Sequence, residues 1–340
     1  MTKTYKVLFL TLIFTSSLIS ISSSSWLGMW LGLEMNLLSI IPLMQNTKSI
    51  LSSEAAIKYF IVQAIASTII MASMILLMTK TSFTSLVNFQ SPSLLMMNSA
   101  LLTKMGTAPF HFWFPEVLEG LDWMNCLLIL TWQKIAPMVL LMYNMNFNLF
   151  MATMILSSMV VSGIMGVNQI SLRKILAYSS INHMGWMLST MMIMETIWLY
   201  YFVIYSLVTM NLVMIFNKLK ISFLNQLYQS MNENPMTKLW FIVNFLSLSG
   251  IPPFLGFLPK WLTIQALVMN SMIALPILMI VLTLITIYMY MRITLTTILM
   301  NINEQNWQMW QPKFNSSFLS ILNFISIASL IFITILFNMV

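Results

Sequence analysis

The segment at residues 101–120, LLTKMGTAPFHFWFPEVLEG, combines features that rarely occur together. It continues an apolar run of the kind that crosses a membrane as a helix, yet Lys104 lies in that run and Gly106 and Pro109 follow directly. Proline removes a backbone donor and clashes with the preceding turn, and glycine adopts conformations that end helices. The segment therefore predicts a membrane helix that is interrupted near its middle, with a lysine just before the break.

A second segment, SGIPPFLGFLPKWL at residues 249–262, repeats this pattern. Both segments contain Gly-x-x-Pro-Phe followed by four residues and a proline, and Lys260 directly follows the second copy. Four matched positions at fixed spacing favour an internal repeat over chance recurrence of Gly and Pro, although both are common in membrane helices. The matched residues are Gly106, Pro109, Phe110 and Pro115 in the first copy and Gly250, Pro253, Phe254 and Pro259 in the second.

The composition places the whole chain in a membrane. Of its 340 residues, 59% are hydrophobic and only 7% are charged, whereas a soluble domain carries about 25% charged residues. Only helices and closed barrels satisfy the backbone in lipid, and the apolar runs of ~20 residues lack the alternation of barrel strands. We therefore predict an all-α polytopic membrane protein.

The residue counts also disfavour several kinds of site. The single cysteine, Cys126, cannot form an intramolecular disulfide, and its spacing from the two histidines matches no metal site. No glycine-rich nucleotide loop is present, and no run of Lys and Arg exceeds two residues despite the net charge of +7, so we expect no nucleic-acid partner. The 35 methionines favour translation under a mitochondrial code over simple use of Met as an apolar filler.

The hydrophobic runs predict eleven membrane helices. A signal peptide is the alternative for the first run, because Lys3 and Lys6 precede it, but no clear cleavage site follows it. The fourth and ninth helices contain the two breaks. The predicted ranges are 7–24, 26–45, 54–79, 94–121, 123–144, 147–167, 172–193, 195–217, 238–271, 273–300 and 315–338.

The loop charges predict the topology. With eleven helices, nine basic residues fall on the side of the N-terminus and only Lys80 falls in a loop on the other side. Basic loops face the side of synthesis, so the N-terminus is predicted to lie on that side and the C-terminus on the opposite one. The nine are Lys3, Lys6, Lys48, Arg173, Lys174, Lys218, Lys220, Lys238 and Lys313.

The two broken helices lie five helices apart, and an odd spacing reverses the orientation of a repeated unit. We therefore predict a single membrane domain, residues 1–340, with a first five-helix repeat at 7–145, an inverted second repeat at 147–300 and a C-terminal helix at 315–338. Inverted repeats with matching interrupted helices point to a transport site.

Five ionisable side chains are predicted at membrane depth, where a charge costs at least ~3 kcal/mol on insertion scales. Lys134 has no acid within helical reach, which favours a functional role over a structural ion pair. For Glu34 and Lys104 a structural pair is the alternative. For Lys260 the alternative is a side chain that reaches the membrane surface, and for His183 it is a hydrogen bond to a neighbouring helix.

The breaks add unpaired backbone groups, which are tolerated at membrane depth only beside protein or water. They therefore imply one polar pocket beside Lys104 and another near Lys260. The residues that make the breaks are Gly106, Pro109, Gly250, Pro252 and Pro253.

A row of buried lysines beside an acid suits proton transfer. A lysine removed from water releases its proton more readily, and a nearby carboxylate opposes that release. Two lysines ~10 Å apart repel by roughly 1.7 kcal/mol at an effective dielectric constant of ~20, so a charge change at one is felt at the next. A dehydrated metal cation would need several oxygen ligands instead. We expect Glu34, Lys104, Lys134 and Lys260 to carry protons, with His183 as a candidate relay.

The remaining charges are expected to be local features. Glu54 and Lys58, four residues apart at a helix start, predict a surface pair, and Glu116 opens an acidic loop that is either solvated or collects protons. Arg292 is expected to reach the membrane surface or to pair. The G-x-x-x-G pattern that ends at Gly32 predicts a close helix contact.

Five segments of the chain resemble a known family, from about Trp26 to Arg292. The resemblance is to the subunit 2 family of mitochondrial NADH:ubiquinone oxidoreductase (respiratory complex I), one of the antiporter-like subunits related to cation/proton antiporters. The segments are SWLGMWLGLEMNLLSIIPL, TKMGTAPFHFWFPEVLEGLDWMN, LTWQKIAPM, SLRKILAYSSINHMGWM and LSLSGIPPFLGFLPKW.

The resemblance implies roles for the buried charges. Glu34 and Lys104 would form the family's glutamate–lysine pair, Lys134 would link two half-channels, and Lys260 would be the lysine of the second broken helix. It also implies that this chain binds no cofactor, since NADH, FMN, the iron–sulfur clusters and ubiquinone would belong to partner subunits.

The resemblance further implies the surroundings of the chain. Its partners would be other membrane-arm and accessory subunits of complex I, together with lipids that include cardiolipin. It would lie in the mitochondrial inner membrane, with its N-terminus in the matrix and its C-terminus in the intermembrane space. Bacterial relatives have fourteen helices, so neighbouring subunits are expected to cover the N-terminal face of this chain.

Three functions compete on these observations. The first is a non-redox, proton-translocating subunit of NADH:ubiquinone oxidoreductase. The second is an autonomous cation/proton antiporter, which would use the same lysines and broken helices. The third is a structural subunit whose buried charges only fix the register of helices.

Overall fold

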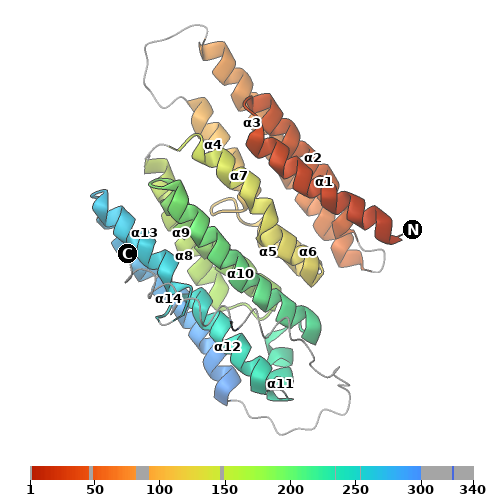
Figure 1. The fold of residues 1–340 in the computed structure, drawn as a ribbon, viewed down its shortest axis with the longest axis vertical. Helices are drawn as coiled ribbons and strands as arrows, with labels where there is room; N and C mark the ends of the chain where they lie inside the picture. The colour runs from red at the N-terminus through yellow and green to blue at the C-terminus, as the bar shows by residue number, and fades with distance from the viewer. Residues whose placement is uncertain are drawn as a thin grey trace. The chain divides into compact units, whose positions relative to one another are not determined.

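Helices make up almost all of the structure. The computed structural model describes residues 2–45, 49–81, 92–145, 149–233, 235–252, 254–299 and 324. Across those residues the chain is helical, apart from turns, short connections and an isolated β-bridge between Ser171 and Phe223 (Figure 1). The helices are α1 (Thr2–Ser22), α2 (Trp26–Met44), α3 (Ile50–Thr81), α4 (Pro92–Met105), α5 (Trp113–Gly120), α6 (Trp123–Leu130), α7 (Trp132–Met142), α8 (Leu149–Val167), α9 (Leu172–Met191), α10 (Glu195–Leu219), α11 (Leu224–Glu233), α12 (Pro235–Ser249), α13 (Phe257–Met269) and α14 (Ala274–Leu299).

Seven spans in the described residues are long and apolar enough to cross a membrane. They lie in α1, α2, α3, the pair α6–α7, α8, α10 and α14. The two predicted broken helices are indeed split, into α4–α5 and α12–α13, and no half of either has 18 residues. A polytopic helical membrane fold is therefore confirmed. The count of eleven stays a prediction, and the helix expected at 315–338 lies outside the described residues.

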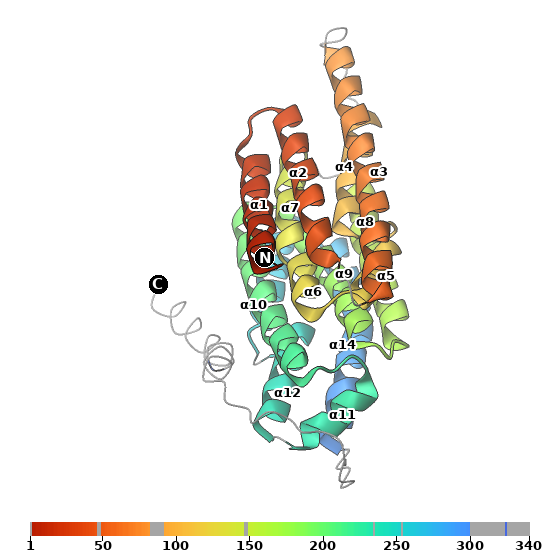
Figure 2. The same ribbon diagram turned by 90° about the vertical axis from the view of Figure 1, so that its right-hand side faces the viewer.

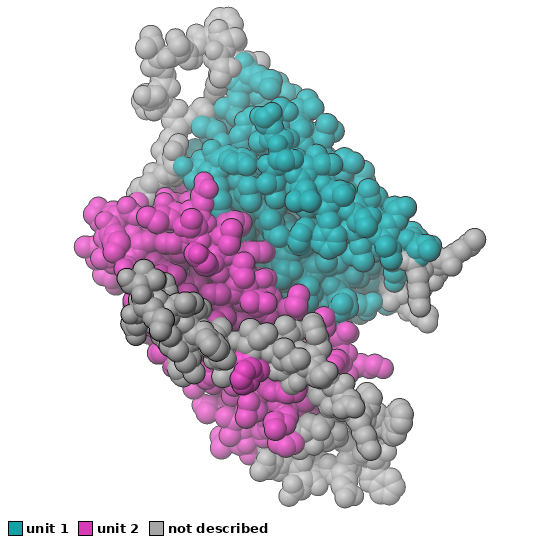
Figure 3. Space-filling view, viewed as in Figure 1, with its two compact units in different colours: residues 1–147 teal, residues 148–340 magenta. Residues whose placement is uncertain are grey.

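The chain divides into two units, residues 1–147 and 148–340 (Figure 3). In the first unit the helices contact one another in a closed cycle: α1 packs on α2, α2 on α3, α3 on α4, α4 on α7, and α7 on α1. Helix α3 has 32 residues, or ~48 Å at 1.5 Å per residue, and one end of it extends past α1 and α2 (Figure 2).

The second unit has the same cyclic order of contacts. Here α8 packs on α9, α9 on α10, α10 on α12, α12 on α14, and α14 on α8. Helix α9 is buried along nearly its full length, including Ser179, Ser180, Asn182 and His183. This burial explains how so polar a helix is accommodated among apolar ones. The inverted orientation of the two repeats stays a prediction.

Two features of the backbone were not predicted. The helix expected at 123–144 is interrupted at Thr131, between α6 and α7. There the Thr131 hydroxyl donates to the Leu127 carbonyl at 2.7 Å, and the Lys134 N–H donates to the Thr131 carbonyl at 3.2 Å. Helix α11 lies between the helices predicted at 195–217 and 238–271, and its short, polar sequence contains no apolar run that would predict it. Its start is stabilised by Gln226, whose side-chain oxygen accepts from the N–H groups of Ser222 and Phe223.

The close contact predicted at Gly32 is confirmed. A Cβ at this position would lie 2.7 Å from the backbone nitrogen and 2.8 Å from the Cα of Ser20 on α1. These distances are shorter than any normal van der Waals contact, and backbone atoms cannot move aside as a flexible side chain can. The absence of a side chain at Gly32 therefore lets α1 and α2 pack backbone to backbone.

We predict that Gly32→Ala forces these helices apart and lowers stability by about 1–3 kcal/mol, as overpacking typically does. The measurement is the thermal unfolding temperature of the purified membrane assembly that contains the chain. Leu31→Ala is the matched control, because Leu31 is 45% exposed on the same turn. Equal effects of the two substitutions would contradict the contact.

Candidate functional site

The first break ends α4 immediately after Lys104. Gly106 has a φ of +74°, a conformation that favours glycine. The carbonyls released at the end of α4 are satisfied by side chains: Trp113 Nε1 donates to the Thr103 carbonyl at 3.1 Å, and Gln63 Nε2 donates to the Lys104 carbonyl at 3.2 Å. The interruption predicted after Lys104 is therefore present, and side chains of the first unit stabilise it by hydrogen bonds.

The same break brings an aromatic ring to Lys134. The Lys134 Nζ lies 5.1 Å from the centre of the Phe114 ring, within cation–π range, and its residue is 2% exposed. Phe114 also covers Gly106, where an added Cβ would meet the ring at 3.0 Å. Phe114 therefore joins the interrupted helix to the lysine on α7.

Glu34 and Lys104, the predicted glutamate–lysine pair, both lie in the first unit. Lys104 is 7% exposed, Glu34 is half-buried, and the charge of Glu34 acts on Lys104. In the described part of the chain, however, the two do not approach to the 4.0 Å of an ion pair. The two residues therefore do not form the direct ion pair that the structural alternative requires.

A pair of amides ties the helix of Glu34 to the helix of Lys134. Asn36 Nδ2 donates to Gln133 Oε1 at 2.8 Å, and Gln133 Nε2 donates back to Asn36 Oδ1 at 3.0 Å. Asn36 lies two residues after Glu34, and Gln133 directly precedes Lys134. This reciprocal bond fixes the positions of the two charged residues along their helices.

The second break is closed by Lys260 itself. Gly250 has a φ of +75°, and the Lys260 Nζ donates to the carbonyl of Ser249, the last residue of α12, at 2.7 Å. An added Cβ at Gly250 would lie 2.7 Å from the Lys260 Cδ and 2.9 Å from its Nζ. The Lys260 Nζ also lies 5.8 Å from the centre of the Trp186 ring. Of the predicted break residues, Pro252 lies in the turn and Pro253 falls outside the described residues.

His183 lies in the same unit, one turn before Trp186 on α9. Its Nδ1 is 2.9 Å from the Tyr201 hydroxyl, and its ring lies 5.1 Å from the ring of Tyr205. The structure thus surrounds this histidine with two tyrosines of α10, and α9 connects it to the environment of Lys260.

All three buried lysines lie at ends of interrupted helices. Lys104 is in the last turn of α4, Lys134 is the third residue of α7, and Lys260 is the fourth residue of α13. Each is 2–7% exposed. An ammonium group removed from bulk water needs acceptors, and for Lys260 the carbonyl of Ser249 at the end of α12 supplies one.

Two features of the first unit were missed or misread from sequence. His111 lies inside the first break, is 3% exposed, and places its Nδ1 3.3 Å from the Pro109 carbonyl; its place within the repeated motif was the available signal.

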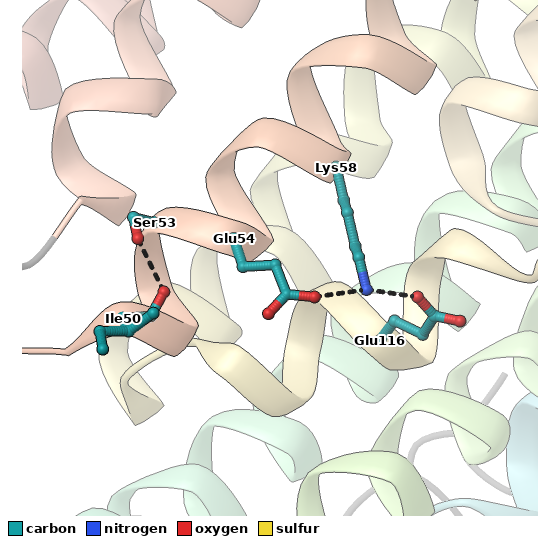
Figure 4. Close-up of polar contacts among 5 residues, drawn as sticks. All are labelled: Ile50, Ser53, Glu54, Lys58 and Glu116. Carbon is teal, nitrogen blue, oxygen red and sulfur yellow. Dashed lines mark hydrogen bonds and ion pairs between the residues drawn. The ribbon is translucent and has the colours of Figure 1, made fainter.

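Lys58 is not part of a purely local pair. It bonds Glu54 at 2.9 Å and also Glu116 of α5 at 2.9 Å (Figure 4). Glu116 lies on α5 and is exposed, in agreement with the prediction that it is solvated, and its bond to Lys58 also joins α5 to α3.

In the described residues no cluster of three or more His, Cys, Asp or Glu side chains could hold a metal ion. The first unit contains buried amines, a carboxylate and an imidazole, and the second contains an amine, an imidazole and hydroxyls. All of these groups bind and release protons or conduct them through hydrogen bonds. The arrangement is chemically suited to proton transfer through a membrane.

Comparison with known proteins agrees with this chemistry. The family described as NADH:quinone oxidoreductase/Mrp antiporter, TM, matches residues 23–286, most of the chain. The chain belongs to this family. Among curated relatives, the NADH-ubiquinone oxidoreductase chain 2 of Anopheles gambiae is 46% identical, with 97% of each chain covered. The protein of the same name from Lemur catta is 41% identical over 88% of this chain and 89% of that one.

Solved structures of family members share the fold. A chain of respiratory complex I from Thermus thermophilus with bound aureothin superposes with a TM-score of 0.81 at 24% identity, covering 96% of this chain and 76% of that one. A chain of the Mrp complex from Dietzia superposes with a TM-score of 0.72 at 17% identity, covering 84% and 59%. At these identities the likeness concerns the fold alone.

We predict that Gly250→Ala displaces Lys260, because the new Cβ would overlap the lysine side chain and the residue would keep an unfavourable positive φ. Proton translocation per substrate oxidised should fall, and stability should fall by about 1–2 kcal/mol from the backbone strain alone. Gly163→Ala is the control, since its Cβ would meet only the Ile285 side chain, at 3.1 Å, without positive φ. Unchanged translocation in Gly250→Ala would contradict the assigned packing.

The amide pair allows a double-mutant test. Gln133→Leu alone should cost about 1–3 kcal/mol, because it leaves a buried amide of Asn36 without its partner. Adding Asn36→Leu should recover much of that loss, since both polar groups are then gone. The free energies come from denaturant titration of the assembly. Strict additivity of the two substitutions would rule out the pair as a tether.

Proposed function

We propose that the chain is an antiporter-like core membrane subunit of a proton-pumping NADH:ubiquinone oxidoreductase, with no redox step of its own. The similarity to chain 2 proteins, over 97% of both chains for the Anopheles gambiae relative, supports this assignment. The single structural observation that carries it is the burial of Lys104, Lys134 and Lys260 at the ends of interrupted helices.

In the first unit, protons would pass between Lys104 and Lys134 under the influence of Glu34. A carboxylate favours the charged amine, and a second charged amine disfavours it, so a change at one lysine alters the proton affinity of the next. The cation–π contact with Phe114 holds the Lys134 amine in place without neutralising it. The Asn36–Gln133 pair keeps the acid and this lysine in register while their charges change.

In the second unit, Lys260 would exchange protons at the carbonyl end of α12. The Ser249 carbonyl accepts from the protonated amine, and the negative end of the half-helix dipole also favours that form. Release of the proton would weaken this bond, because a neutral amine is a poorer donor than an ammonium group. His183, bonded to the Tyr201 hydroxyl, is the candidate relay, because imidazole and hydroxyl groups both donate and accept.

The wider assignment follows from membership in such a complex. NADH, FMN, iron–sulfur clusters and ubiquinone would be bound by partner subunits, while this chain contributes membrane helices and proton-binding side chains. Its partners would be the other membrane-arm and accessory subunits, and its location the mitochondrial inner membrane, with the N-terminus in the matrix. The identical cyclic packing order of the two units supports two five-helix repeats, at 7–145 and 147–300, and their inverted orientation is part of the proposal.

We predict that Lys134→Met preserves assembly and reduces proton pumping. Methionine is a similarly long apolar side chain, so it fills the site at little cost in packing, but it cannot bind a proton. The measurements are the amount of active complex on a native gel and the ratio of protons translocated to NADH oxidised in sealed vesicles. Lys238→Met at the start of α12, away from the buried row, is the control.

The outcome separates the three candidate functions. A normal proton ratio with weakened assembly would contradict the proposal and favour a purely structural subunit. Absence of the wild-type chain from the NADH-oxidising band, together with cation/proton exchange independent of NADH, would favour an autonomous antiporter.

A further inference from the structure

One end of the second unit contains a pocket that the proton path does not use. Its volume is about 270 Å³. The end of α8 and the following linker form one wall, Ile175 of α9 forms another, and α11 and α14 complete it with Leu224, Tyr228, Met289, Arg292 and Ile293. The linker is held in place by the Ser171–Phe223 bridge and by the Leu224 N–H, which donates to the Ile170 carbonyl at 3.1 Å.

The lining of this pocket combines a cation with neutral donors. The lining residues include Arg292, which has a guanidinium, Tyr228, which has a hydroxyl, and Asn168 and Gln169, which have amides. The Gln169 Nε2 already donates to the Met165 carbonyl at 3.1 Å. No acidic side chain occurs among its lining residues. The remaining wall is mainly aliphatic. A site with a guanidinium, several neutral donors and no carboxylate favours an anion with oxygen acceptors, such as a phosphate group.

The pocket lies where a membrane helix ends. Gly166 and Val167, at the end of α8, are part of its wall. Helix α8 has 19 residues, or ~28 Å at 1.5 Å per residue, which matches the ~30 Å hydrocarbon core of a bilayer. Its last residues therefore reach the headgroup region, which places the pocket that they line at that depth.

The same end of the unit is rich in positive charge. The ends of α8 and α10, the starts of α9 and α12, and all of α11 meet there, as the Leu172 N–H bond to the Ser222 carbonyl illustrates. This concentration of cations attracts anionic lipids at a membrane surface. The basic residues at this end are Arg173, Lys174, Lys218, Lys220, Lys238 and Arg292.

We propose that this pocket binds the phosphate group of an anionic phospholipid, with Arg292 and Tyr228 as its principal donors. The volume suits a headgroup and is too small for a whole lipid, so the acyl chains remain in the bilayer beside the aliphatic wall. The bound lipid joins α8, α11 and α14 at the membrane surface. This role is independent of proton translocation and does not rest on the function proposed above.

The test uses the intact membrane assembly that contains the chain, in its native membranes. Two photoactivatable probes are compared, phosphatidylglycerol and phosphatidylcholine, each with a diazirine near the glycerol end of an acyl chain. Labelled peptides are identified by mass spectrometry. We expect phosphatidylglycerol to label peptides from residues 166–175 or 289–293 in preference to phosphatidylcholine, because only the former has a net negative headgroup.

Variants connect the labelling to the pocket. Arg292→Gln should reduce labelling by phosphatidylglycerol about tenfold, as the loss of a charge-assisted hydrogen bond to an anion predicts. Lys238→Gln, which removes a charge at the same end but outside the pocket, should change it little. If Arg292→Gln prevents assembly, the comparison of the two probes on the wild-type assembly still tests the proposal.

Three results would overturn the proposal. Equal labelling by both probes would mean that the pocket does not select an anionic headgroup. Labelling that excess inorganic phosphate abolishes would identify free phosphate, not lipid, as the ligand. No labelling of these peptides in the intact assembly would mean that a partner subunit covers the pocket.

Discussion

A helix that stops inside a membrane exposes carbonyl groups that lipid cannot satisfy, and much of this structure follows from that constraint. At the end of α4 the carbonyls of Thr103 and Lys104 are bonded by Trp113 and Gln63. At the end of α12 the Ser249 carbonyl is bonded by Lys260. In the first case neutral side chains close the break, and in the second a cation does so. The hydrogen bond at the second break is therefore the one that loss of the charge on Lys260 would weaken.

The glycines that begin the two breaks make these arrangements possible in different ways. Both have nearly the same positive φ, +74° at Gly106 and +75° at Gly250, so the backbone turns alike in each. Next to Gly106 the space is filled by Phe114, which contacts Lys134, whereas next to Gly250 it is filled by Lys260. The same backbone turn is therefore covered by an aromatic ring that contacts a buried lysine in one unit and by a buried lysine itself in the other.

The two units share their packing order but not their charges. Lys260 lies ten residues after Gly250, and the residue ten positions after Gly106 is Glu116. Glu116 is exposed and pairs with Lys58, while Lys260 is buried. The repeat therefore preserves the positions of helices and interruptions. The ionisable groups differ between the copies, and an exposed charge such as that of Glu116 costs far less than a charge at membrane depth.

Local sequence was sufficient to predict the helices, the two Gly/Pro breaks and the burial of the lysines. These depend on the length of apolar runs and on residues that cannot continue a helix, both of which act within a few residues. It was not sufficient for the third interruption, at Thr131, whose residue type is common within helices, or for α11, which lacks an apolar run. Helix α9 is polar, and it fits among apolar helices because nearly all of its residues are buried inside the second unit and not exposed to lipid.

The partners of the buried groups were decided by the tertiary structure. Nothing near Lys134 in the chain indicates Phe114, and nothing near Glu34 indicates that Asn36 bonds a glutamine 97 residues away. Lys58 likewise has a sequence neighbour, Glu54, and a second partner that only packing brings to it. Composition and spacing specify which side chains enter the membrane, because burial depends on local polarity. Which groups then meet depends on how helices distant in sequence pack, and local patterns carry no information about that.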